Sequence, residues 1–174
     1  MIKNQRGVLL YLARKVGVNL LTGKSIMNVS LPIKIFEPRS MLEKIGSDFR
    51  FVSYYLGKMM EVEDPIERMK IAVTWYIASL QIEPQMLKPF NPILGETFQG
   101  TIGEYEIALE QISHHPPVSG IQIWSETVPN SPKINGHFQH EAHTGISAIT
   151  GYKNGYLDIE FPDGYKLTFT EFPG

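Results

Sequence analysis

The sequence predicts an α+β fold that is mainly β, with helices first and an antiparallel meander of strands after them. Two observations predict it. Apolar residues recur at helical spacing before Pro92, whereas residues 97–172 carry short runs rich in Ile, Val, Thr, Phe and Tyr. Turn signals separate those runs, and strands that are joined by tight turns must be antiparallel. The 174 residues give room for one domain.

The first predicted element is a short amphipathic helix within residues 6–22. Val8, Leu9, Leu12 and Val16 recur at helical spacing, and basic residues lie between them. Such a helix could lie on a membrane, cover a pocket or pack on the core, and the spacing alone does not choose among these.

Two further helices are expected before the strands. The first begins at Ser40, which forms a Ser-x-x-Glu capping pattern with Glu43. The second begins at Asp64, with Pro65 at the first helical position, where a missing N–H costs nothing. The expected buried faces are Leu42, Ile45, Phe49, Val52 and Leu56 for the first, and Met69, Val73, Tyr76 and Leu80 for the second.

The strands are predicted from the turn signals between them. These signals are Gly103, residues 129–132, Asn135-Gly136, Asn154-Gly155 and Asp163-Gly164. The last two dipeptides suit type I′ hairpin turns, whose two central residues need positive φ. Residues 156–161 and 165–169 are expected to flank the final turn. A curled sheet of this kind leaves two edges, of which one needs covering, so we expect the chain to be a piece of something larger.

Charge and cysteine content limit the classes of function. The absence of cysteine excludes a disulfide framework, a thiolate metal site and a thiol nucleophile. The net charge is -2, yet residues 1–36 hold six basic residues and no acidic one. Such a segment favours an anionic surface, and a solvated basic end or a mitochondrial presequence are the alternatives. The apolar run at residues 8–13 is far shorter than the roughly 20 residues that span a bilayer.

The segment of residues 88–96, KPFNPILGE, is a candidate binding loop rather than a purely structural connection. Pro89 and Pro92 fix their own φ and push Lys88 and Asn91 toward extended geometry. A stiff loop of this kind can hold an ammonium and an amide in a fixed relation, which suits a phosphorylated or hydroxylated head group. The alternative is a rigid helix-to-strand connector with a solvated lysine.

A second unusual segment is residues 110–117, EQISHHPP. Neighbouring residues of a strand face opposite sides, so His114 and His115 can share a ligand only where the strand ends or bends, and Pro116-Pro117 imposes such an end. Histidine titrates near pH 6.5 and a phosphomonoester near pH 6, so each stabilises the charged form of the other. The pair therefore suits a phosphate clamp.

Other interpretations of the histidines compete. Adjacent imidazoles are poor metal chelators, and a hydrolase that used Ser113 would need an orienting carboxylate and an oxyanion motif, which the sequence does not display. A structural pair remains an alternative. His137, His140 and His143 are interpreted as ordinary polar strand residues.

Three segments together resemble the oxysterol-binding protein-related family. EQISHHPP closely resembles the fingerprint of that family and differs by one Val-to-Ile change, and KPFNPILGE is similar to its second signature loop. Residues 31–43 resemble the segment after the family's lid. The resemblance implies a large, nearly closed β-barrel with a tunnel for one lipid. Residues 1–174 would be the N-terminal part of that domain, and the barrel would be incompletely closed: residues 6–22 lid-like, 40–82 helices and 97–172 barrel strands.

The function that the resemblance implies is lipid binding and transfer between membranes, in which phosphatidylinositol 4-phosphate is exchanged for a sterol or phosphatidylserine. Lys88 and Asn91 would contact the inositol phosphate head group, and His114 and His115 the 4-phosphate. No catalysis, cofactor, metal or nucleic acid is implied. The chain would be cytoplasmic and peripheral, meeting an anionic membrane surface transiently at membranes or membrane contact sites. The alternative is a non-transferring, phosphoinositide-responsive regulator or adaptor.

Overall fold

The computed structural model describes residues 14, 33, 36–79, 87–144 and 149–170. The chain divides into two units, residues 1–39 with 84–90 and residues 40–83 with 91–174, and each is described by itself. The amphipathic helix expected within residues 6–22 lies outside the described residues, apart from Arg14.

The first unit contains a short two-stranded sheet, in which β1 (Phe36–Ser40) pairs with β2 (Lys88–Phe90). The rings of Phe36 and Phe90 stack with their centroids 4.7 Å apart and an interplanar angle of 16°. The extended geometry that was predicted for Lys88 is confirmed, because a proline follows it and disfavours the helical region. The pairing of this segment with residues 36–40 was not predicted.

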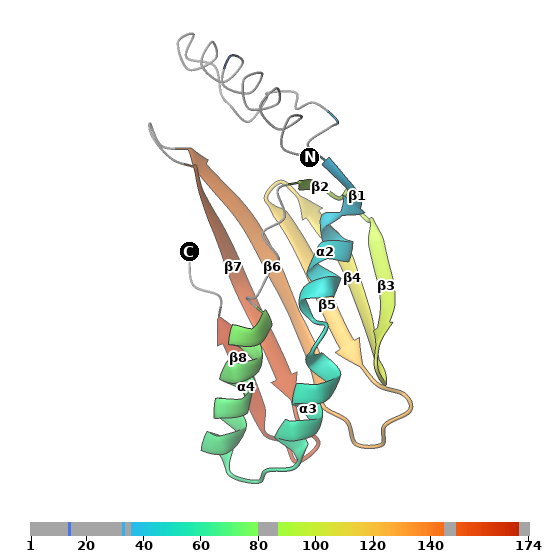
Figure 1. The fold of residues 1–174 in the computed structure, drawn as a ribbon, viewed down its shortest axis with the longest axis vertical. Helices are drawn as coiled ribbons and strands as arrows, with labels where there is room; N and C mark the ends of the chain where they lie inside the picture. Colours follow the sequence, from blue (N-terminus) through green and yellow to red (C-terminus); the bar gives the residue numbers. More distant parts are fainter. Residues whose placement is uncertain (1–13, 15–32, 34–35, 80–86, 145–148, 171–174) are drawn as a thin grey trace, which may run out of the picture. The chain divides into compact units, whose positions relative to one another are not determined.

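The second unit is built on an antiparallel sheet in which each strand pairs with the next along the chain (Figure 1). Its strands are β3 (Thr97–Ile102), β4 (Tyr105–His114), β5 (Pro117–Trp124), β6 (Lys133–Thr144), β7 (Ile149–Glu160) and β8 (Lys166–Thr170). Within the described residues, β3 and β8 pair on one side only, so the sheet is not closed. The predicted α+β, mainly β, fold is confirmed.

Helices cover one face of this sheet, as Figure 1 shows. They are α2 (Met41–Asp48), α3 (Val52–Met60) and α4 (Pro65–Ser79). The side chain of Ser40 caps α2 by accepting a hydrogen bond from the backbone N–H of Leu42 at 3.2 Å, so the predicted start is confirmed. The predicted face of Leu42, Ile45, Phe49, Val52 and Leu56 is buried. The prediction that these residues form one continuous helix was wrong, because a turn at residues 49–51 separates α2 from α3.

The predicted buried stripe of α4 was wrong by one residue, which is a rotation of about 100° on a helix. Met69 and Val73 are 47% and 45% exposed, and the buried residues are Arg68, Ala72 and Trp75. Leu80 lies outside the described residues. The start at Asp64 is confirmed, since its carboxylate accepts a hydrogen bond from Ile66 at 2.9 Å.

Arg68 gives the physical reason for this rotation. Its guanidinium donates to the backbone carbonyls of Met59 and Val62 at 3.2 and 2.9 Å, and it pairs with Asp163 at 2.7 Å. It also lies 4.4 Å from the centroid of the Phe161 ring. These contacts satisfy a buried charge, so the arginine faces the sheet and the aliphatic side chains turn outward.

Two of the predicted turns are instead strand interiors. Asn135-Gly136 lies within β6 and Asn154-Gly155 within β7, where Gly155 pairs with Phe138. A side chain at Gly155 would collide with the carbonyl of His137, and one at Gly136 with the carbonyl of Tyr156. These glycines therefore permit a close approach of β6 and β7 rather than a reversal of the chain.

The other predicted turns are confirmed. Gly103 has φ of 61° between β3 and β4, and residues 129–132 lie between β5 and β6. Residues 161–165 reverse the chain between β7 and β8, where Gly164 has φ of 83° and donates to the carbonyl of Phe161. The type I′ assignment of that turn was wrong, because Asp163 does not have positive φ.

Candidate functional site

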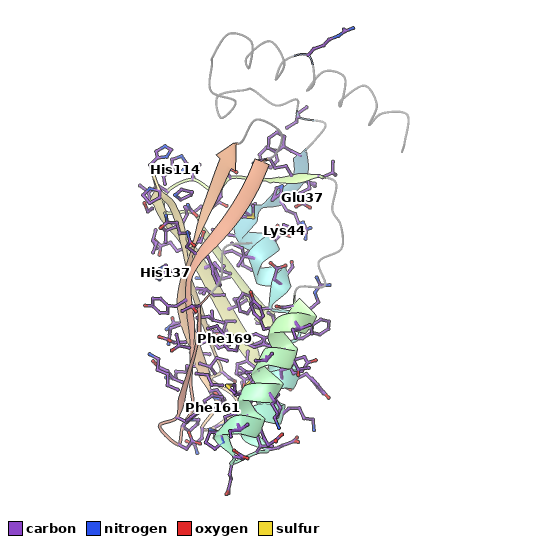
Figure 2. All side chains as sticks on the ribbon, turned by 90° about the vertical axis from the view of Figure 1, so that its left-hand side faces the viewer. Glu37, Lys44, His114, His137, Phe161 and Phe169 are labelled. Atoms are coloured by element: carbon purple, nitrogen blue, oxygen red, sulfur yellow. The ribbon has the colours of Figure 1, made fainter. Side chains whose placement is uncertain are left out.

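The histidine pair lies at the end of the second unit's sheet, where β4 stops. β4 ends at His114 and β5 begins at Pro117, so His115 and Pro116 form the connection, with a cis peptide bond between them. The end that was predicted at Pro116-Pro117 is confirmed. The two imidazole rings are exposed, with centroids 4.5 Å apart at an angle of 58°. Two neighbouring rings can therefore face one ligand, and Figure 2 shows His114 at this end.

Gln111 fixes the backbone that leads to the histidines. The register of β4 shifts between Gln111 and Ser113, and the side-chain amide of Gln111 donates to the carbonyl of Ser113 at 2.7 Å across that irregularity. The hydroxyl of Ser119 on β5 donates to the amide oxygen of Gln111 at 2.7 Å. Gln111 and Ser119 are 2% and 3% exposed. A buried glutamine, bonded through both its amide nitrogen and its amide oxygen, thus holds the bulge from which the histidines project.

The segment after Pro92 folds into a tight turn that is joined to the same point of β4. In this signature turn, residues 93–96, the N–H of Glu96 donates to the carbonyl of Ile93 at 3.0 Å, and Gly95 has φ of 78°. Gly95 donates to the carbonyl of Gln111 at 2.9 Å, and the N–H of Gln111 donates to the carbonyl of Glu96 at 3.0 Å. Both unusual sequence segments therefore meet at Gln111.

Lys88 belongs to the first unit. It is half-buried, and its ammonium donates to the carbonyl of Pro89 at 3.3 Å and lies 5.3 Å from the centroid of the Phe36 ring. Burial lowers the pKa of Lys88 from its ordinary value of 10.5. A partly desolvated ammonium gains more from an anionic ligand than a fully hydrated one does.

The predicted site residues divide between the two units. His114 and His115 lie together, and Asn91 is exposed two residues before the signature turn in the same unit. That Lys88 contacts the same ligand as the histidines stays a prediction. Gln111, Ser119 and Glu96 were missed as positioning residues. The signal was a glutamine at a strand position whose alternate neighbours, Ile107 and Leu109, are apolar and buried.

The other three histidines lie on one strand. His137, His140 and His143 all lie on β6, and the ring of His137 packs edge-on against that of Tyr156 with centroids 4.7 Å apart. Among the residues that the structure describes, no group of three or more His, Asp or Glu side chains is placed to hold a metal ion. No helix in the described ranges is both long and apolar enough to cross a membrane.

The two faces of the sheet in the second unit differ in chemistry. The helix-covered face is filled by core side chains, among them Ile107, Ile123 and Phe138. The other face carries a hollow of about 460 Å³ with a mixed lining: Thr97, Gln99, Ala108, Leu109, Glu110, Ile112, Gly120, Ile121, Gln122, Asn135, Gly136 and Tyr156. The hydrophobic lipid tunnel thus stays a prediction.

Comparison with known proteins decides the family. Residues 18–170 match the family described as "Oxysterol-binding protein". The chain belongs to the oxysterol-binding protein family. It is 39% identical over 170 residues to oxysterol-binding protein 9 of Dictyostelium discoideum, covering 97% of this chain and 39% of that protein. This member of the family therefore spans about two fifths of the length of that relative.

Solved structures of the family share the fold. The Osh3 ORD from Saccharomyces cerevisiae, in complex with PI(4)P, aligns with a TM-score of 0.76 and 23% identity over 94% of this chain and 42% of that one. The Osh1 ORD domain in complex with cholesterol aligns with a TM-score of 0.72 and 25% identity over 84% of this chain and 36% of that one. The antiparallel sheet with its helices is thus the architecture of this family.

Proposed function

We propose that this oxysterol-binding protein family member binds a phosphoinositide head group and exchanges that lipid for a sterol or phosphatidylserine between membranes. The observation that carries the proposal is the histidine pair at the end of β4, with rings 4.5 Å apart on a backbone that Gln111 holds. Imidazoles that are fixed in this way can donate two hydrogen bonds to one phosphate without losing much conformational freedom on binding.

The remaining ligand contacts follow the same chemistry. Lys88 would add a partly desolvated positive charge and Asn91 an amide, and both suit the inositol ring and its phosphate. The Osh3 and Osh1 domains, which share this fold, are complexes with PI(4)P and with cholesterol, which favours the same two classes of ligand here. The protein would work at cytoplasmic membrane surfaces, where these lipids are exposed.

Lipid extraction from liposomes tests the proposal. The double substitution of His114→Ala and His115→Ala should weaken phosphatidylinositol 4-phosphate extraction by about 100-fold or more, since it removes two hydrogen bonds to a charged group and each contributes roughly 1.5–3 kcal/mol. Sterol or phosphatidylserine extraction should change less. His137→Ala is the matched control, because its ring packs on Tyr156 away from the strand end.

Three outcomes would redirect the proposal. Equal loss of both lipids in the double variant would indicate misfolding rather than a lost phosphate contact. Recruitment to phosphoinositide-containing liposomes without extraction would favour the regulator or adaptor over a transfer protein. Unchanged phosphoinositide extraction in the double variant would remove the histidine pair from the site.

A further inference from the structure

The signature turn presents two neighbouring aliphatic side chains to solvent. Ile93 and Leu94 are 70% and 64% exposed. Other turns of the same unit carry acidic residues instead: Glu104 follows Gly103 between β3 and β4, and Asp163 precedes Gly164 between β7 and β8. The signature turn thus differs from these two described turns in its apolar tip.

Hydrogen bonds hold the turn in this conformation. The carboxylate of Glu96 accepts from the N–H of Ile93 at 3.0 Å, in addition to the backbone bond between the same two residues. The bonds from Gly95 and Glu96 to Gln111 fix the turn on β4. The two aliphatic side chains thus stay outside, and the backbone groups that would be costly to place in an apolar medium already have partners.

The apolar tip lies at the same end of the sheet as the histidine pair. β3 starts beside the position where β4 ends, so the turn before β3 and the histidines after Gln111 share that end. Ile112, which follows Gln111, is also 53% exposed. The carboxylate of Glu96 already accepts a hydrogen bond from Ile93. The exposed imidazoles beside the tip can donate hydrogen bonds to the phosphates of a lipid surface.

An apolar tip beside two imidazoles suits the surface of a bilayer. Aliphatic side chains at an exposed tip favour acyl chains, while imidazoles beside them favour the phosphate level. A protein partner would need a groove shaped to the tip, whereas a fluid bilayer accommodates a projecting turn without one. We propose that the signature turn inserts Ile93 and Leu94 into the interface of a phosphoinositide-containing membrane and so places His114 and His115 at the head groups. The inference rests on the function proposed above.

Vesicle partitioning separates insertion from head-group binding. The pair Ile93→Asn with Leu94→Asn should weaken binding to phosphatidylcholine vesicles that contain phosphatidylinositol 4-phosphate by roughly 10- to 100-fold. Binding of a water-soluble, short-chain form of the same lipid should change less than twofold. The pair Ile66→Asn with Ile77→Asn on α4 is the matched control, since these side chains are 58% and 61% exposed, and it should leave both measurements unchanged.

The variant with His114→Ala and His115→Ala tests head-group binding separately from insertion. If the proposed function fails and insertion holds, that variant binds the soluble lipid as the unchanged protein does, while the turn variant still loses the vesicles. If insertion fails and the proposed function holds, the turn variant binds vesicles normally, and the histidine variant loses the soluble lipid. Equal loss of vesicle binding in the turn variant and the α4 control would also overturn the inference.

A fluorescent label reports insertion directly. The chain has no cysteine, so Leu94→Cys gives one labelling position, and Ile77→Cys gives its control. An environment-sensitive dye at position 94 should shift to shorter wavelength on adding the vesicles, and the dye at position 77 should not. No shift at position 94, or a concentration-dependent shift there without vesicles, would overturn the inference; the second result would show that another copy of the chain covers the turn.

Discussion

Substitution of Gln111 by leucine should destabilise the protein and weaken head-group binding together. The change removes an acceptor for the Ser119 hydroxyl and a donor for the Ser113 carbonyl, both at 2.7 Å and in surroundings where Gln111 is 2% exposed. The backbone bonds of residue 111 to the signature turn do not need its side chain. The loss is thus confined to the two side-chain hydrogen bonds.

The magnitude follows from these two bonds. A buried polar group that is left without a partner costs about 1–3 kcal/mol, so Gln111→Leu should lower the free energy of unfolding by about 2–4 kcal/mol. With a urea dependence of about 2 kcal/mol per M, the unfolding midpoint should fall by about 1–2 M. The fluorescence of the two tryptophans provides the measurement.

A double-mutant cycle with Ser119→Ala identifies the contact. Alone, Ser119→Ala should cost about 1–2 kcal/mol, because it leaves the amide oxygen of Gln111 unpaired. Combined with Gln111→Leu it should cost less than the sum by about 1 kcal/mol, since both partners of one hydrogen bond are then absent. Strict additivity, or a Gln111→Leu midpoint within about 0.2 M of the unchanged protein, would refute the reasoning.

Two further predictions concern titration. The N–H of Tyr165 and the guanidinium of Arg68 lower the pKa of Asp163, so the stability that it contributes is present above its unfolded-state pKa, near 3.9, and is lost as pH falls through the lower folded-state value. Urea midpoints measured from pH 2 to 6 should therefore fall less steeply with acid in Asp163→Asn, and an unchanged slope would contradict this; Glu126→Gln is the control. Burial lowers the pKa of Lys88, and a bound phosphate would raise it again, so binding should take up a proton between the lowered value and 10.5. Calorimetry near pH 9.5 in buffers of different ionisation enthalpy should detect this uptake, and its persistence in Lys88→Met would assign it elsewhere.

Hydrophobic spacing predicted the elements whose burial depends on apolar residues alone. Leu42, Ile45 and Leu56 were placed on the buried face correctly, because these apolar side chains pack in the core. The strands were expected correctly within residues 97–172, although two of the turns between them were not. The lid-like segment within residues 6–22, apart from Arg14, lies outside the described residues, so that prediction stays untested.

Hydrophobic spacing did not predict the buried face of α4, where a polar side chain determines the packing. On α4 the aliphatic residues at positions 69 and 73 suggested one face. Arg68, however, bonds two carbonyls at the end of α3 and just after it, and it contacts a carboxylate and an aromatic ring in the turn after β7. Hydrophobic spacing ranks side chains by polarity and does not reveal how many partners a buried arginine has. The buried face of α4 is therefore offset by one residue from the predicted face.

The Asn-Gly dipeptides failed for a related reason. A glycine fits both a positive-φ turn and a point where two backbones come close, and the sequence does not distinguish these. Gly136 and Gly155 face carbonyls across β6 and β7, whereas Gly164 and Gly103 reverse the chain. Only the register in which β6 pairs with β7 separates the two uses, and that register is a property of the sheet.

The candidate site depends on the same kind of irregularity. Regular alternation would place His114 and His115 on opposite faces, and they share an end only because β4 shifts register after Gln111 and stops at His114. The sequence displayed the prolines, so the end of the strand was predicted. It did not display that one buried glutamine would join the bulge and β5 through its side chain and the signature turn through its backbone. The geometry of the histidine pair is therefore set by a residue that touches no ligand in the proposed mechanism, which makes Gln111 the sharpest test of whether that geometry matters.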